Sequence, residues 1–358
     1  MSTTDEIHDK LFCRGTDVPR LSVDARSSVG EGGRTEAVLS STEVVDQHFV
    51  PRGYLKRFEE AERHIWVTSV DGSHRNLRRS RSVATRPHGY RVTAGSGVNL
   101  SVEDWLARRV ETPGFPVLHR LIADPGAITR LAAEGEQALA RFVAALMVRV
   151  PKRHVDAQAV AHEVVGNIKE FHRNSIKKKL GEETGAEWFR HWDVEPDHVW
   201  LGATEPLDFP TFAAEALSQI SGWANVLLSM PWACGASRLS LFTSDNPVSR
   251  FAGRRPPSAD PYGWPDFEDF HYYLALSPSC LLVIGPWPDD VNEVQAQIER
   301  GQIQGPRTAH SFSPWESAFA RRVIAADANQ ELYGKEANIT KEEAVLDLGR
   351  LAPVMRRY

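Results

Sequence analysis

Cysteine and long apolar runs are both scarce in this chain. Its three cysteines, Cys13, Cys234 and Cys280, are widely separated among 358 residues and show no CxxC spacing, which disfavours a disulfide framework and a cysteine zinc site. The most apolar run, residues 272–286, is broken by Ser-Pro-Ser and is too short to cross a bilayer. The polar, acidic N-terminus lacks the apolar core of a secretory signal. We therefore expect a soluble, cytoplasmic protein without a membrane partner.

Motifs that would identify a common enzyme class are also absent. The chain has no glycine-rich phosphate loop of the Walker or Rossmann type and no Gly-x-Ser-x-Gly nucleophile elbow. His162-Glu163 lacks the second histidine of a zincin motif, because Gly166 stands in its place. His154, His162 and His172 fall on neighbouring helical segments and make only a weak metal site. The cofactor stays unknown: a divalent metal is compatible with the sequence but not indicated, and no metal ligand is assigned.

The charge balance bears on the kind of partner. The net charge of −5 argues against a general nucleic-acid or membrane binder, so a small-molecule or peptide substrate is favoured over nucleic acid. One segment has the opposite character: residues 74–91 carry many arginines and no acidic residue. This arginine-rich hairpin could bind phosphate or nucleic acid, or it could be a solvated hairpin face. The oligomeric state is not indicated.

The chain divides into three segments. Residues 1–44 are polar and without periodicity, so they gain little apolar burial to offset the entropy of ordering, and we interpret them as a flexible arm. Residues 45–330 have the composition of a single α+β domain, since apolar residues make up 42% of the chain and charged residues 25%. Residues 331–358 are expected to form a C-terminal helical tail.

Strand patterns occur near both ends of the domain. A strand at 65–70 is followed by Asp71-Gly72, a pair typical of a tight hairpin turn, and by a return strand within 75–83. Further short strand-like runs lie at 239–243, 273–276 and 280–284.

Helical patterns fill the middle of the chain and recur near its end. A first helix begins near Trp105 and is expected to stop near Pro113, and a long amphipathic helix ends or kinks at Pro151. Further helices are expected at 157–179, 212–228, 291–298 and 315–328. This order predicts an α+β fold in which N- and C-terminal strands form a mixed or antiparallel sheet, packed against a central set of helices.

Two motifs combine polar groups with a proline that restricts the backbone. The first runs from residue 46 to 58 (DQHFVPRGYLKRF) and the second from 241 to 247 (LFTSDNP). The HFVP start of the first motif, with Tyr54-Leu55 and Phe58, resembles the opening signature of domain-of-unknown-function family 4238. Further matches follow in the expected order, namely Glu111, Arg149-Val150-Pro151, Pro231-Trp232, Thr243 to Pro247 and Tyr273 to Pro278.

The resemblance covers residues 45–330, and Gly53 stands where a bulkier residue is expected. It implies a mainly bacterial, soluble protein and transfers no known activity. The chemistry must therefore be argued from the residues themselves.

The motifs supply four candidate catalytic residues. His48 titrates near neutrality and is the natural general acid or base. Asp245 could orient an imidazole, act as a base or ligate a metal. Asn246 could donate a hydrogen bond to a substrate oxygen. Glu111 is the fourth candidate catalytic residue.

Four further residues are candidates for binding substrate: Arg52, Tyr54, Arg149 and Ser244. Arg149 could clamp a carboxylate or phosphate, or it could form a buried ion pair with Glu111 beneath the site. Structural roles are open for the motifs as well. His48 could bond a backbone carbonyl in the core, and Ser-Asp-Asn-Pro is good turn chemistry.

Three functions remain compatible with these residues. The first is a hydrolase in which His48 and Asp245 converge in a cleft and an arginine binds an anion, with phosphoester and amide substrates both open. The second is a non-catalytic regulatory or defence protein that binds nucleic acid or protein through the arginine-rich hairpin. The third is a tailoring enzyme for a small molecule or peptide, whose apolar pocket would be lined by some of the ten tryptophans.

Overall fold

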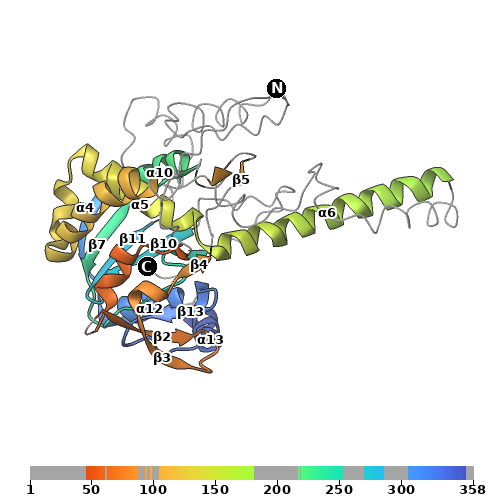
Figure 1. Cartoon of the computed structure of the whole chain (residues 1–358). Helices are drawn as coiled ribbons and strands as arrows, with labels where there is room; N and C mark the ends of the chain where they lie inside the picture. The colour runs from red at the N-terminus through yellow and green to blue at the C-terminus, as the bar shows by residue number, and fades with distance from the viewer. Residues whose placement is uncertain are drawn as a thin grey trace, which may run out of the picture.

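The structure is a computed structural model. Its described residues are 46–60, 63–87, 93–94, 97–98, 105–180, 217, 219–252, 270–285 and 305–351. The N-terminal arm and the helix expected at 291–298 lie outside the described residues. The α+β prediction is confirmed, because helices pack against two main sheets (Figure 1).

The larger sheet is mixed and is built from the second half of the chain. Its strand order is β12-β7-β11-β10-β9. The five strands are β7 (Trp232–Ala236), β9 (Ser249–Ala252), β10 (Phe270–Ser277), β11 (Cys280–Ile284) and β12 (Arg307–Ser311). Strand β12 runs parallel to β7, and the other neighbours are antiparallel. The apolar runs predicted at 273–276 and 280–284 become the paired strands β10 and β11, which are buried because the sheet is covered.

The smaller sheet joins the two ends of the domain. Its order is β3-β2-β13-β8, with β2 (His64–Ser69), β3 (Arg75–Arg79), β8 (Thr243–Ser244) and β13 (Glu331–Tyr333). The pairing of N- and C-terminal strands is thus confirmed. The start of the C-terminal helical tail needs correction, since residues 331–333 lie in the middle of this sheet and α13 (Lys341–Leu351) begins later. The sequence concealed this strand because three residues are too few to show a period.

The predicted hairpin is present between β2 and β3. Gly72 has a φ of +73°, a conformation that glycine adopts without steric cost, and the Asp71 carboxylate accepts a hydrogen bond from the Ser73 amide at 2.9 Å. All five residues of β3 are exposed, so this strand forms a solvated edge of the sheet.

The central helices pack over the larger sheet. In Figure 1 they form a group at the upper left that covers β7, β11 and β10. The group consists of α4 (Thr112–Ala123), α5 (Ala133–Val148) and α10 (Ile220–Ser229). Leu139, Phe142 and Leu146 of α5 are buried as the amphipathic pattern predicted.

The helix expected to stop near Pro113 instead continues through it. A π-helical segment, η3 (Ala107–Glu111), precedes α4, so Pro113 falls in the first turn of α4. A proline is tolerated there because its missing N–H has no required partner in a first turn. The expectation of a stop at Pro113 was therefore wrong.

Helix α6 (Pro151–Leu180) is separated from the end of α5 by two residues and extends away from the body (Figure 1). Pro151 thus separates two helices, as predicted. Among the described residues, none of the helices has the length and apolarity needed to cross a membrane. The start of α6 contributes residues to the site described next.

Candidate functional site

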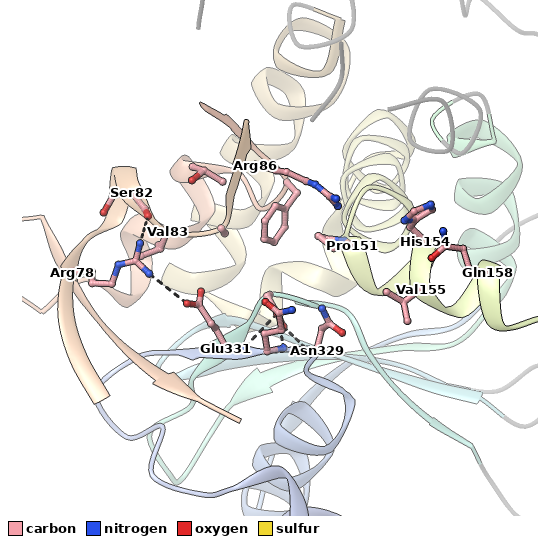
Figure 2. Close-up of a pocket in the computed structure, with 15 residues that line it drawn as sticks. Arg78, Ser82, Val83, Arg86, Pro151, His154, Val155, Gln158, Asn329 and Glu331 are labelled. Atoms are coloured by element: carbon pink, nitrogen blue, oxygen red, sulfur yellow. Dashed lines mark hydrogen bonds and ion pairs between the residues drawn. The ribbon is translucent and has the colours of Figure 1, made fainter. Parts of the chain in front are cut away.

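A cleft of about 550 Å³ lies between the arginine-rich hairpin, the start of α6 and the segment before β13 (Figure 2). Both motifs reach it, the first through Phe49 and the second through Asp245. Its other lining residues are Arg78, Ser82, Val83, Ala84, Thr85, Arg86, Pro151, His154, Val155, Gln158, Asn329, Gln330 and Glu331. The polar side chains therefore come from four segments that are distant in sequence, namely 78–86, 154–158, 245 and 329–331.

Arg86 and Arg78 occupy different parts of this cleft. Arg86 extends toward Pro151 and His154 of α6 (Figure 2). Arg78 donates hydrogen bonds to the Ser82 carbonyl at 2.7 Å and to the Glu331 carboxylate at 3.4 Å. The part of the cleft near α6 thus contains the guanidinium of Arg86, whereas the part near Ser82 contains Arg78 paired with Glu331.

The first motif is held at the cleft by backbone contacts. Strand β1 (Asp46–His48) pairs with β4 (Thr85–Pro87), and the Phe49 amide donates to the Ala84 carbonyl at 3.0 Å. The chain then turns into the short helix α2 (Arg52–Leu55). The Pro51 carbonyl accepts hydrogen bonds from the amides of Tyr54 and Leu55. Pro51 thereby fixes the direction in which the motif leaves the strand.

His48 lies among charged residues that the sequence had marked. Burial has the largest effect on His48 and lowers its pKa. The charges of Arg52 and Arg149 also lower this pKa, whereas Glu111 and a hydrogen bond with the Ser80 backbone raise it. His48 is therefore neutral at neutral pH and able to accept a proton. Four of the eight candidate residues thus act on one another electrostatically, although none of these four is among the described residues that line the cleft.

The buried ion pair expected between Arg149 and Glu111 is confirmed. Nη1 of Arg149 lies 3.0 Å from Oε1 of Glu111. The Arg149 residue is 1% exposed, whereas the Glu111 side chain is 24% exposed. Arg149 ends α5 and Glu111 ends the π-helical segment, so the pair joins two helices across the helical layer.

Tyr54 connects the two motifs in the core. Its hydroxyl lies 2.9 Å from Oγ1 of Thr243 and donates to the Ala275 carbonyl at 2.7 Å. The residue is fully buried, and burial raises the pKa of its hydroxyl. The candidate substrate-binding role of Tyr54 is therefore replaced by a structural one, because the side chain reaches no solvent.

Gly53 lies where the packing leaves no room for a side chain. A Cβ atom at this position would lie 2.5 Å from Cζ of Phe115. The ring of Phe115 occupies the space that a bulkier residue would need. The guanidinium carbon of Arg57 lies 5.2 Å from the centre of the same ring, in a cation–π contact.

Asp245 uses both carboxylate oxygens to hold the segment before β13. They accept hydrogen bonds from the amides of Asn329, Gln330 and Glu331 at 2.8, 2.7 and 3.3 Å. Burial nevertheless raises the pKa of Asp245 to about 6, because desolvation outweighs the three amides. Asp245 is thus both a turn-stabilising residue and a cleft carboxyl that exchanges protons near neutral pH.

Ser244 and Asn246 have structural partners. Oγ of Ser244 donates to the Asn246 carbonyl at 2.8 Å and accepts from the Asn246 amide at 3.1 Å. Nδ2 of Asn246 donates to the carboxylate of Asp327 at 2.9 Å. Both residues are buried, so the turn chemistry considered for this motif is present. A direct bond between His48 and Asp245 stays a prediction.

Sequence reasoning missed several residues of the cleft. His154 was considered only as a weak metal ligand, and Asn329, Gln330 and Glu331 carry no motif. Arg86 was noted only as part of the basic segment. Within the described ranges, no group of three or more histidine, cysteine, aspartate or glutamate side chains could hold a metal ion.

The fold and site define an α+β protein with a polar cleft where the smaller sheet, the β1–β4 pair and the start of α6 meet. Residues 46–338 match the family described as "Protein of unknown function (DUF4238)", and the chain belongs to that family. The match begins at the first motif and extends beyond the second. No curated protein and no solved structure matches the chain.

Proposed function

We propose that this protein is a cytoplasmic bacterial hydrolase whose substrate binds in the cleft. The observation that carries the proposal is a buried carboxyl, Asp245, with a pKa of about 6 at the edge of a cavity of about 550 Å³. Cavities of this size suit small ligands. Perturbed carboxyls in clefts are candidates for proton transfer, because a group that titrates near the working pH is an efficient acid or base.

Two proton-transfer groups divide the work in this proposal. His48 is neutral and can accept a proton, and Asp245 can donate or accept one near neutral pH. An arginine binds the anionic group of the substrate. Phosphoester and amide bonds remain alternative targets, since both need a base and a polarised oxygen.

Hydrolysis of chromogenic substrates tests the proposal. The panel contains p-nitrophenyl phosphate, bis(p-nitrophenyl) phosphate, p-nitrophenyl acetate and an amino-acid p-nitroanilide, each with and without Mg²⁺, Mn²⁺ or Zn²⁺. We expect the wild-type chain to turn over at least one of them. Replacing Asp245→Asn should lower kcat by about 100-fold or more, the usual contribution of an acid or base.

Asp156→Asn is the matched control, because this carboxylate pairs with Lys152 at 3.1 Å and does not line the cleft. Its kcat should stay within about twofold of wild type, as expected for a surface change. No release of p-nitrophenol or p-nitroaniline above the buffer rate in any condition would refute the proposal. Equal activity in Asp245→Asn would refute the role of Asp245.

Binding of nucleic acid through the arginine-rich hairpin is the second candidate. The exposure of the whole of β3 favours it, and Arg79 and Arg81 are both exposed. Fluorescence anisotropy with a labelled single-stranded 20-mer of DNA or RNA, at 25 mM and 150 mM salt, separates this function from the first. Binding that weakens with salt and with Arg79→Gln/Arg81→Gln would support it. The tailoring-enzyme alternative has less support, because Phe49 is the one Phe, Tyr or Trp among the described residues lining the cleft.

A further inference from the structure

Two arginines beside His48 have buried donors without acceptors. Nε of Arg52 and Nε of Arg149 are enclosed, and neither has a hydrogen-bond partner among the groups that the structure describes. A buried donor left without an acceptor is destabilising, and such groups in native proteins usually bind a water molecule or an ion. The two unpaired N–H groups therefore call for an acceptor that the described residues do not provide.

Among the residues that the structure describes, the charges around these donors do not balance. Arg52 and Arg149 each carry a positive charge, and Glu111 supplies one negative charge through its bond to Arg149. His48 is uncharged at neutral pH. One positive charge is left in a largely buried cluster, where an uncompensated charge is costly. A bound anion would remove both the surplus charge and the unpaired donors.

The cluster is reachable from solvent and held by three separate elements. Arg52 begins α2, Arg149 caps α5 and Glu111 ends the π-helical segment. Arg52 is partly exposed and the Glu111 side chain is 24% exposed, whereas Arg149 is almost fully enclosed. The cluster is thus open to solvent at Arg52 and Glu111 and closed at Arg149.

We propose that Arg52 and Arg149 form an oxyanion site that binds a phosphate or a carboxylate group. Guanidinium N–H groups from two elements suit a ligand with two or more acceptor oxygens, and charge-assisted hydrogen bonds of this kind are the strong ones. The site extends the proposed function, because it would bind an anionic group of the hydrolase's substrate. Only the assignment of this anion to the substrate rests on the proposed function.

Calorimetric titration with inorganic phosphate, and separately with acetate, tests the site. Both titrations are run against NaCl at matched ionic strength, so that a nonspecific salt effect cancels. We expect saturable binding of one anion, and which one binds shows whether the site takes a tetrahedral phosphate or a planar carboxylate. Arg52→Gln should weaken that binding by about tenfold or more, the loss expected for a charge-assisted bond.

Lys56→Gln is the matched control. It removes the same charge four residues later on an exposed side chain, so its binding should equal that of wild type. Arg52→Lys separates charge from geometry: it keeps the charge but loses the planar fork, and we expect weaker binding than in wild type. A circular dichroism melt of each variant confirms that it is folded.

The outcomes separate this inference from the hydrolase proposal. Saturable anion binding that depends on Arg52 supports the site even if no chromogenic substrate is cleaved. Absence of phosphate- and acetate-specific binding overturns the site even if a substrate is cleaved. Equal affinity of Arg52→Gln and wild type also overturns it, because the ligand would then bind elsewhere.

Discussion

At the scale of single residues, Asp245 combines two roles that usually conflict. Its carboxylate accepts three backbone hydrogen bonds, which favour the ionised form, yet burial has the larger effect and raises the pKa of the group to about 6. A carboxyl of this kind holds the segment before β13 while remaining able to exchange a proton. The chemistry therefore depends on the same contacts as the local structure.

The pH dependence of stability tests this description of Asp245. The folded state prefers the protonated carboxyl, since its pKa is about 6 in the folded protein against 3.8 ordinarily. This contribution to the free energy of unfolding is complete below pH 4 and is lost as pH rises to about 6, by up to about 3 kcal/mol. Asp245→Asn should abolish that part of the slope in urea denaturation at pH 4, 5, 6 and 7.

The comparison must be made between variants, because burial also raises the pKa of Asp327. Glu342→Gln, a change at an exposed position in α13, leaves both buried carboxyls and their partners in place, so it should retain the wild-type slope. Identical slopes for wild type and Asp245→Asn would contradict the raised pKa.

At the scale of elements, α12 (Pro314–Asp327) shows how local sequence defines a helix start. Oγ of Ser313 accepts from the Glu316 amide at 3.2 Å, and the Glu316 carboxylate accepts from the Ser313 amide at 2.7 Å. Pro314 occupies the first turn, where its missing N–H costs nothing. Together these contacts form a capping box.

Ser313→Ala should remove one side of this capping box. We expect the free energy of unfolding to fall by about 1 kcal/mol, the usual cost of losing a serine cap. Ser311→Ala, a change at an exposed position in β12, should alter it by less than about 0.5 kcal/mol. Urea denaturation of both variants at one pH provides the measurement. A loss in Ser313→Ala no greater than that in Ser311→Ala would contradict the assigned cap.

At the scale of the whole molecule, β13 holds the ends of the domain together. It pairs with β2 on one side and β8 on the other, so its backbone bonds link residues 67–69 to residues 243–244. The family match to residue 338 includes this strand. The domain therefore needs residues that the composition had assigned to a separate tail.

Truncation after residue 330 tests this dependence. The shortened chain loses the interior strand of the smaller sheet and leaves β2 and β8 with unpaired edges, so it should fail to give a cooperative thermal transition. A chain that ends at residue 351 retains β13 and α13 and should melt like the full chain. A cooperative transition in the chain ending at 330 would show that β13 is dispensable.

Local patterns predicted much of the fold. The turn at Asp71-Gly72, the amphipathic face of α5 and the buried strands β10 and β11 were all readable, because each depends on residues near one another in sequence. Patterns failed at Pro113, where a π-helical segment moved the proline into a first turn, and at β13, which is too short to show a period. The candidate site was predicted in part, since the Arg149–Glu111 pair is present but Tyr54 lies in the core.

Local sequence was enough to predict the type of most elements, the two motifs and the residues able to transfer protons or bind anions. Only the tertiary structure decided what these residues contact. The Tyr54 hydroxyl bonds to Thr243, and Asp245 bonds to the amides of residues 329–331. The charges of Arg52 and Arg149 both act on His48. The physical reason is that hydrogen bonding within a turn or helix is encoded by neighbouring residues, whereas burial and charge depend on segments brought together by the closure of long loops.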